Sequence, residues 1–231
     1  MGAEDAAGRA AAMFDGGSDG RWSRRVASGA MSAVRPLEPN PVGVAAVRGT
    51  LAAAFVTDPM LRWIFPDPVQ QSEATAAWLG VFVEAYASAG VTDVVDTDTM
   101  ATAGVALWRC TREPLPFSQA PSAGGLLAAF VGVERAATLG NGLRAFADHK
   151  PDPPFHYLQF LAVHPSQQGH GLGRQLVLHG QRRAANAGVG VYLESTNPRN
   201  LAFYASCGFR RLSEFTLQPD GPPTFRLWWQ P

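Results

Sequence analysis

Apolar residues recur along this chain at two spacings, one typical of amphipathic helices and one typical of strands. In the first half, helix-like segments end at turn-forming Asp, Pro and Gly residues, and two β-branched segments joined by Asp98-Thr99 predict a hairpin. The predicted elements are a short strand over residues 34–37, helices over residues 42–55 and 69–89, and hairpin strands over residues 91–97 and 103–109.

The second half begins with a helical region over residues 126–149, which we expect to be interrupted near Gly140. After a run of prolines the pattern becomes strand, loop, helix and strand, with Gly188 as the stop signal of the helix. The predicted elements are strands over residues 155–163, 189–194, 209–217 and 224–229, with helices over residues 172–187 and 198–206. This order of elements indicates an α/β fold.

The N-terminal residues differ from the rest. Residues 1–33 are rich in Gly, Ala, Ser and Arg and show no apolar period, so we expect a flexible N-terminal extension. Residues 34–231 have the length and the apolar content of one ordinary domain, and we expect a single domain there.

Composition narrows the range of functions. The 231 residues are 46% hydrophobic and 16% charged, which is typical of a globular protein. Nineteen basic residues balance nineteen acidic ones, so we expect neither a nucleic acid nor a membrane surface as partner. No apolar run reaches the roughly 18 residues of a membrane span, and no secretory signal is visible, so we expect a cytoplasmic protein. Cys110 and Cys207 are expected to be ordinary reduced thiols.

The most informative motif is a glycine-rich loop, Gln-Gln-Gly-His-Gly-Leu-Gly at residues 167–173, between a predicted strand and a predicted helix. Glycines at alternate positions let backbone N–H groups face outward, and the helix that follows presents its positive end, so this loop is suited to hold an anion. A tight turn that only permits close packing is the alternative. Arg174 and Gln175 stand where a P-loop needs Lys and then Ser or Thr, so nucleoside triphosphate hydrolysis is not expected.

The local charge favours the same kind of ligand. Between His164 and Asn200 the only acid is Glu194, and the basic residues are Arg174, Arg182, Arg183 and Arg199. A ligand that carries phosphate explains this excess of positive charge, whereas a solvated helix face is an equally good explanation for the adjacent pair Arg182 and Arg183.

These motifs occur in a recognisable order. The run Tyr-Leu-Gln-Phe-Leu-Ala-Val-His-Pro at residues 157–165 is followed by Gln168-x-x-Gly171-x-Gly173, then by Asn200, Tyr204 and Gly208-Phe209. In this order they resemble the GCN5-related N-acetyltransferase (GNAT) superfamily. The segments Leu-Glu-Ser-Thr at residues 193–196 and Pro-Arg-Asn-Leu at residues 198–201 are most similar to its puromycin N-acetyltransferase-like branch. The resemblance is strong over residues 155–229.

The resemblance implies a mixed, mostly antiparallel sheet that is splayed at a cleft for acetyl-CoA and flanked by helices. It also implies that backbone groups of the strand bind the pantetheine and that N–H groups of the glycine-rich loop bind the pyrophosphate. The cofactor-binding residues expected on this basis are Leu161, Ala162, Val163, Gln168, Gly169, His170, Gly171, Leu172, Gly173, Arg174 and Asn200. We expect no metal, because the histidines of this region share no helix face and lack ligand spacing.

Acetylation of an amine requires a neutral amine, a site for the developing oxyanion and an acid for the departing thiolate. Asn200 and Tyr204 are four residues apart on a predicted helix and therefore share a face. The resemblance implies that Tyr204 is the proton donor, with a structural core tyrosine as the alternative. Glu194 ends a strand beside the expected cleft and is our candidate general base, with a structural carboxylate as the alternative. His156 and Tyr157 are further candidates for the base.

Together, the residues and the resemblance predict an acetyl-CoA-dependent N-acetyltransferase that acts on a small-molecule amine by direct attack in a ternary complex, as a monomer or homodimer. A non-catalytic acyl-CoA-binding module and an acetyltransferase of protein or peptide amines are the alternatives. Five residues of the N-terminal half are candidates for an aromatic, acidic acceptor pocket, with a helix core and solvated acids as the alternative. They are Asp58, Trp63, Phe65, Asp67 and Trp78.

Overall fold

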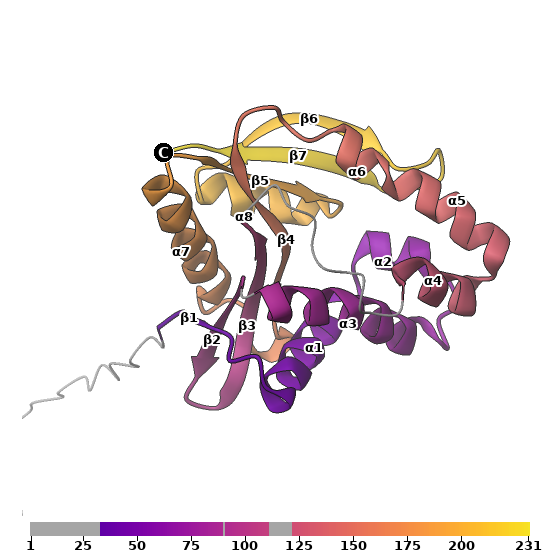
Figure 1. Cartoon of the computed structure of the whole chain (residues 1–231), viewed down its shortest axis with the longest axis horizontal. Coiled ribbons are helices and arrows are strands. Elements are labelled where there is room, and N and C mark those ends of the chain that lie inside the picture. The colour runs from indigo at the N-terminus through magenta and orange to yellow at the C-terminus, as the bar shows by residue number, and fades with distance from the viewer. Residues whose placement is uncertain (1–32, 90, 111–121) are drawn as a thin grey trace, which may run out of the picture. The chain divides into compact units, whose positions relative to one another are not determined.

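The computed structural model describes residues 33–89, 91–110 and 122–231 (Figure 1). The predicted N-terminal extension therefore lies almost wholly outside the described residues. Met31–Pro231 form one unit by their contacts. No helix among the described residues is both long enough and apolar enough to cross a membrane.

The described strands form a seven-stranded sheet with the order β1-β2-β3-β4-β5-β7-β6. The strands are β1 (Arg35–Pro36), β2 (Thr92–Thr97), β3 (Met100–Arg109), β4 (Phe155–Val163), β5 (Gly190–Ser195), β6 (Arg210–Thr216) and β7 (Pro223–Trp229). Only β4 and β5 run parallel, and all other neighbours are antiparallel. The hairpin and the later strands are thus confirmed, with small shifts of their ends.

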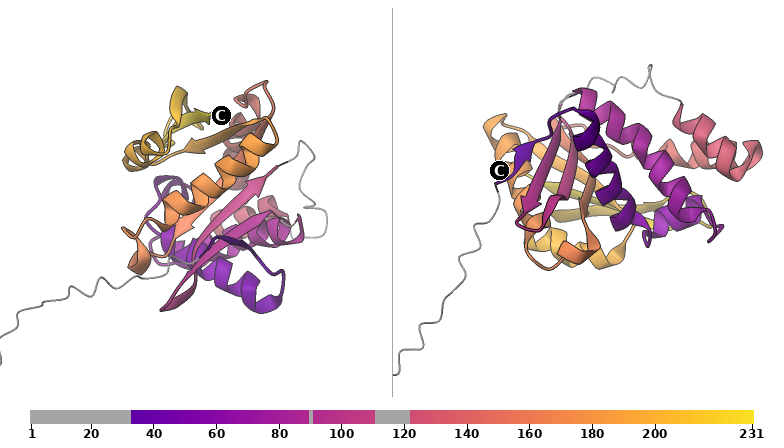
Figure 2. Two further views of the ribbon diagram at one scale, coloured as in Figure 1. Left: turned by 90° about the vertical axis from the view of Figure 1, so that its left-hand side faces the viewer. Right: turned by 90° about the horizontal axis from the view of Figure 1, so that it is seen from below.

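The sheet opens between β4 and β5. These strands pair only from Phe155 opposite Gly190 to Tyr157 opposite Tyr192, and past that point their ladder ends. The left view of Figure 2 shows the C-terminal strands, in yellow, diverging from the hairpin of β2 and β3. The predicted fold, a mixed and mostly antiparallel sheet splayed at a cleft and flanked by helices, is confirmed.

Eight α-helices are present in the described residues. They are α1 (Pro41–Phe55), α2 (Pro59–Ile64), α3 (Gln71–Ala89), α4 (Ala123–Val131), α5 (Val133–Leu143), α6 (Ala145–Asp148), α7 (Leu172–Asn186) and α8 (Leu201–Ser206). Short 3-10 turns, Pro165–Gln167 and Pro198–Asn200, precede α7 and α8.

Helices cover both faces of the first half of the sheet because its strands alternate apolar side chains between the faces. On β3, Val105 and Leu107 belong to the core under α1 and α3, whereas Ala106 and Trp108 belong to the core under α7. The backbone of α7 comes so close that a Cβ on Gly180 would lie 2.1 Å from the Trp108 ring. This close packing fixes α7, and with it the glycine-rich loop, against the sheet.

The helices differ from the prediction at two places. No helix was predicted over Pro59–Ile64, yet Asp58 caps one there by accepting hydrogen bonds from Met60 N (2.9 Å) and Leu61 N (3.3 Å), with Pro59 at the first helical position. The interruption expected near Gly140 falls a few residues later, where α5 ends at Leu143 and α6 begins at Ala145. A further break, which was not predicted, falls at Gly132, whose φ of +81° is readily adopted only by glycine.

Candidate active site

Two connected hollows open where β4 and β5 separate. The first, about 470 Å³, lies along the glycine-rich loop and the start of α7, and we call it the loop cleft. The second, about 260 Å³, is lined by β4, β5 and side chains from helices α1, α2, α3, α5, α6 and α8, and we call it the inner cavity. Leu161, Asn200 and Tyr204 line both hollows, so ligands in the two would meet at these residues.

The glycine-rich loop presents unpaired backbone donors to the loop cleft. Gly169 and Gly171 have φ values of +82° and +79°, and no heavy atom lies within 4 Å of where a Cβ would be placed at either residue. Among the described residues, the N–H groups of residues 169–174 have no acceptor, and α7 has no side-chain cap. Free N–H groups at the start of a 15-residue helix attract an anion. Close packing alone does not account for the open space in front of both glycines.

β4 supplies a second set of backbone groups. Its ladder with β3 continues to Val163, whereas its ladder with β5 ends at Tyr157. From Leu158 onward, the β5 side of β4 therefore has no strand partner, and its N–H and C=O groups are available to an extended ligand. Leu161 and Val163, predicted to contact such a ligand, both line the loop cleft.

The inner cavity has a wall of connected aromatic rings. Phe160 meets Phe55 and Phe82 edge to face, with ring centroids 5.7 and 5.3 Å apart, and Phe82 meets Trp78 in the same way at 4.9 Å. Phe146 also lines the cavity. Polar groups interrupt this apolar wall at Asp58, Lys150, Tyr157, Gln159, Glu194 and Thr196. Such a surface suits a ligand with an apolar body and a few polar atoms.

Tyr204 stands at the junction of the two hollows. The residue is 8% exposed, and the rings of Phe203 and Phe209 hold its ring at centroid distances of 5.1 and 5.7 Å. Within the described residues its hydroxyl forms no hydrogen bond. Burial, and to a lesser extent the nearby Cys207 and Asp58, raise the pKa of Tyr204 well above its usual value. The hydroxyl is therefore protonated at neutral pH and free to donate to a ligand.

Glu194 lines the inner cavity from the end of β5. Both its carboxylate oxygens are buried, and neither makes a well-formed hydrogen bond within the described residues. Burial raises the pKa of Glu194, and the nearby hydroxyls of Tyr157 and Tyr192 oppose that effect, followed by Lys150 and Arg226. A buried carboxylate with an elevated pKa is suited to accept a proton near neutral pH.

Asp58 is a second carboxylate on the cavity wall, and its position is fixed because it caps α2. Burial raises its pKa, which the backbone N–H groups of Leu61 and Met60 and the hydroxyl of Thr196 partly offset. Of the residues predicted for an acceptor pocket, Asp58 and Trp78 line the inner cavity. Phe65 and Asp67 line a separate, smaller hollow, and the Trp63 indole donates to Asp220 at 3.1 Å.

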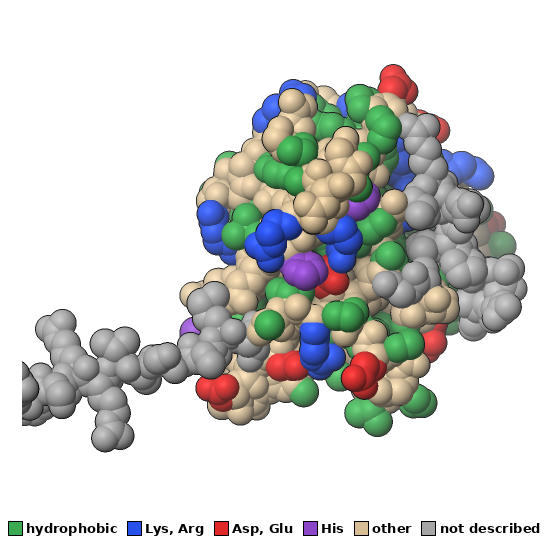
Figure 3. All heavy atoms as spheres, turned by 60° about the vertical axis from the view of Figure 1, so that its left-hand side comes forward, with side chains coloured by type: hydrophobic (Ala, Val, Ile, Leu, Met, Phe, Trp, Pro, Cys, Tyr) green, Lys and Arg blue, Asp and Glu red, His purple; other side chains and the backbone are tan. Residues whose placement is uncertain are grey.

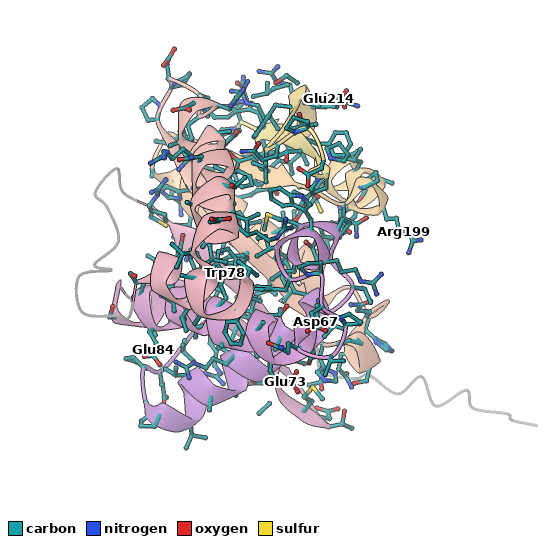
Figure 4. The ribbon with its side chains drawn as sticks, turned by 90° about the vertical axis from the view of Figure 1, so that its right-hand side faces the viewer. Asp67, Glu73, Trp78, Glu84, Arg199 and Glu214 are labelled. Atoms are coloured by element: carbon teal, nitrogen blue, oxygen red, sulfur yellow. The ribbon has the colours of Figure 1, made fainter. Side chains whose placement is uncertain are left out.

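The arginines near the glycine-rich loop divide into two groups. Arg174 lines the loop cleft and donates to the carbonyl oxygen of Ser206 at 2.7 Å. Arg183 instead pairs with the buried Asp93 at 2.7 Å on the α7 side of the molecule, where Figure 3 shows basic side chains beside a histidine and an acid. Arg199 is exposed and points away from the surface in Figure 4. Of the arginines predicted near a phosphate, Arg174 is the one that lines the loop cleft, and Arg183 has an internal partner.

Most of the predicted cofactor-binding residues line the loop cleft, and two do not. Ala162 is buried in the core under α1 and α3, and the His170 ring lies against the carbonyl oxygen of Gln167. For Ala162, only the backbone groups are therefore available to a ligand. Of the further base candidates, Tyr157 lines the inner cavity, whereas His156 lies on the other side of the sheet near Arg183, which together with burial lowers its pKa.

Sequence reasoning missed Lys150 and Gln159 as cavity residues. Gln159 accepts a hydrogen bond from the hydroxyl of Tyr86 at 3.3 Å. Lys150 follows the end of α6 and is the only lysine in the sequence. That fact could have identified it from the sequence as a candidate site residue. At this position the chain has the compact ammonium group of lysine, whereas its other basic residues all carry the larger guanidinium group of arginine.

Comparisons with known proteins agree with this geometry. Residues 105–209 match the Acetyltransferase (GNAT) family. A solved structure of a Corynebacterium glutamicum protein, described as histone acetyltransferase HPA2 and related acetyltransferase, is 30% identical. That match has a TM-score of 0.61 and covers 87% of this chain and 97% of the other. The chain belongs to the GNAT family of acetyltransferases.

One curated protein and one further solved structure are also similar to this GNAT acetyltransferase. A mycothiol acetyltransferase of Kineococcus radiotolerans is 34% identical over 84 residues, which is 36% of this chain and only 28% of that protein's length. A structure of the NatC complex bound to Gag peptide and CoA shares the fold, with a TM-score of 0.50 and 15% identity over 87% of this chain and 99% of the other. The GNAT prediction is confirmed, and the puromycin N-acetyltransferase-like branch stays a prediction.

Proposed function

We propose that this GNAT enzyme transfers the acetyl group of acetyl-CoA to the amine of a small molecule by direct attack in a ternary complex. The observation that carries the proposal is the meeting of the loop cleft and the inner cavity at Leu161, Asn200 and Tyr204. Two substrates bound side by side have their reacting atoms adjacent only if their sites share such a boundary.

The loop cleft is assigned to acetyl-CoA. The free N–H groups of residues 169–174, with Arg174 beside them, fit the pyrophosphate, and the unpaired side of β4 fits the amides of the pantetheine. GNAT acetyltransferases use acetyl-CoA, and the surroundings of this cleft carry no feature against it. Asn200 lies at the boundary and is assigned as a contact of the coenzyme.

The proton transfers are assigned to Glu194, in the inner cavity, and to Tyr204, at that boundary. Glu194 accepts the proton of the acceptor ammonium, directly or through water, and the neutral nitrogen attacks the thioester carbonyl. The C–S bond then breaks, and the hydroxyl of Tyr204 protonates the departing thiolate. Its elevated pKa keeps that proton in place until the thiolate forms. Solvent takes the remaining extra proton of the acylated nitrogen and the proton held by Glu194, and returns one proton to Tyr204, so the net products are the N-acetyl compound, CoA and one proton.

A small acceptor is favoured by the shape of the inner cavity. The cavity of about 260 Å³ is lined by side chains of both halves of the domain, a size that fits a small molecule, whereas a protein or peptide amine would need a long groove. The name of the Kineococcus relative also refers to a small molecule, mycothiol.

The test combines binding with turnover. Calorimetry should give a single acetyl-CoA site, and thiol release should be dependent on added small amines. Acetyl-CoA binding without amine-dependent thiol release would favour the non-catalytic acyl-CoA-binding module. Thiol release with peptides and with no small amine would favour the alternative of protein acetylation. Failure to bind acetyl-CoA would overturn the assignment of the loop cleft.

A further inference from the structure

The inner cavity is lined by one cation that has no carboxylate partner. Lys150 lines the cavity, and its Nζ lies 4.7 Å from the centroid of the Tyr157 ring. Among the described residues it takes part in no ion pair. Burial, followed by the nearby Arg109, lowers the pKa of Lys150, and the charge of Glu194 opposes that effect.

The same cavity is lined by an anion that has no cation in contact. The oxygens of Glu194 are buried and have no well-formed hydrogen bond within the described residues, and no ion pair there joins Glu194 to Lys150. Arg226 lies opposite Glu194 on β7, but its guanidinium donates to the hydroxyls of Tyr192 (3.2 Å) and Ser213 (3.1 Å). Two opposite charges thus face one space without neutralising each other by contact.

A ligand that carries both charges would compensate both groups at once. An ammonium group would pair with Glu194, and a carboxylate of the same molecule would pair with Lys150. Aromatic side chains, among them Phe55, Trp78 and Phe82, form much of the remaining wall, so the body of the ligand is apolar. The second carboxylate on the wall, Asp58, already accepts hydrogen bonds as the cap of α2.

Resting on the proposed function, we propose that the acceptor is an amino acid with an apolar body, and that Lys150 binds its carboxylate. Lys150 is then the residue by which the enzyme discriminates amino acids from amines that lack a carboxylate. The chemistry is unchanged: the acceptor nitrogen loses its proton to Glu194 and forms the new C–N bond as the C–S bond breaks. The product has lost its positive charge and with it the attraction to Glu194, which assists its release.

Matched substrate pairs test this proposal. Phenylalanine is compared with 2-phenylethylamine, and 6-aminohexanoate with hexylamine, because the members of a pair differ mainly in the carboxylate. With acetyl-CoA saturating, kcat/KM of the wild-type enzyme should be about tenfold or more higher for the acid in at least one pair. Lys150→Met should remove that preference, so that kcat/KM becomes similar for the two members of a pair, and Lys150→Arg should retain part of it.

A second cation beside the same tyrosine provides the matched control. The Arg109 guanidinium lies 5.3 Å from the Tyr157 ring centroid but does not line the cavity. Arg109→Met removes a nearby positive charge without removing the proposed contact, so the preference for the acid should survive. Equal losses in both variants would mean that Lys150 acts only through the general field, and would overturn the proposal.

Binding gives a second readout that does not need turnover. Each compound is titrated by calorimetry into the wild-type enzyme and the Lys150→Met variant, both loaded with CoA. Tighter binding of the acids by the wild-type enzyme alone supports the proposal. Simple amines that bind and react as well as the acids, with no effect of Lys150→Met, would overturn it while leaving the acetyltransferase function intact. Loss of acetyl-CoA binding itself would instead indicate failure of the proposed function.

Discussion

The loop cleft and the inner cavity are joined, but different parts of the chain build them. The loop cleft is formed mostly by backbone groups of one continuous stretch, from the end of β4 through the glycine-rich loop to the start of α7. The inner cavity is formed by side chains from helices and strands that are far apart in the sequence. Backbone recognition depends on main-chain geometry and tolerates changes of side chain, whereas the cavity depends on the identity of each residue. The loop cleft therefore suits a substrate common to the family, and the inner cavity suits an acceptor particular to this enzyme.

The largest effect is expected in the inner cavity, at Glu194. Glu194→Gln should lower kcat by about 10²- to 10⁴-fold, because the amide cannot accept the acceptor's proton. Burial raises the pKa of Glu194, so wild-type activity should fall with decreasing pH at a higher pH than an exposed glutamate would give. That acid limb should vanish in the variant when kcat is measured at saturating acceptor.

Glu214→Gln is the control, since Glu214 is an exposed acid paired with Arg211. Retention of full activity and of the acid limb would remove Glu194 from the mechanism.

At the boundary of the two hollows, Tyr204→Phe should lower kcat by roughly 10²-fold and leave acetyl-CoA affinity within a few fold. The ring packing is preserved and only the proton is removed. Single-turnover acetyl transfer separates this effect from slow product release. Tyr86→Phe controls for the loss of a buried tyrosine hydroxyl, because Tyr86 donates to Gln159 and does not line the cavity. If Tyr204→Phe only lowers stability by about 1 kcal/mol, as the control should, the tyrosine is structural.

In the loop cleft, Gly171→Asp should weaken acetyl-CoA binding by about tenfold or more in calorimetry, because a carboxylate would enter the space in front of the free N–H groups. The control is Gly188→Asp at the other end of α7, where the glycine also has a positive φ, of +66°. Both variants carry a similar backbone strain, so circular dichroism and thermal unfolding should change similarly. Equal coenzyme affinity in the two variants would contradict the assignment of the loop cleft.

The smallest expected effect is on stability, at Asp58, which caps helix α2 beside the inner cavity. Asp58→Ala should lower the free energy of unfolding by about 1 kcal/mol, because it removes the cap of α2. Asp58→Asn should cost only a few tenths of that, since asparagine is an equally good cap. Denaturant unfolding of both variants measures the difference. Equal losses would mean that the charge of Asp58, and not its capping bonds, stabilises the fold.

The loop cleft could be predicted from the sequence better than the inner cavity, because one continuous segment forms most of it. The glycine-rich loop, the strand before it and the helix after it were all predicted, since local rules for glycine and helix starts define them. Of the residues predicted for the acceptor pocket, only Asp58 and Trp78 line the inner cavity, and the prediction was wrong for Trp63, Phe65 and Asp67. Nothing local distinguishes Trp78, which faces the cavity, from Phe65 nearby.

The sequence by itself predicted the strands of the second half, helices α7 and α8, the α/β class and the glycine-rich loop proposed to bind the anion, because these depend on neighbours within a few positions. Only the tertiary structure decided that β5 leaves β4 after Tyr192, that Arg183 is bound to Asp93, and that Lys150 and Glu194 face one cavity. Each of these facts joins segments that are distant along the chain. Their contacts follow from how helices and strands pack together, and no periodicity or motif within one segment encodes them.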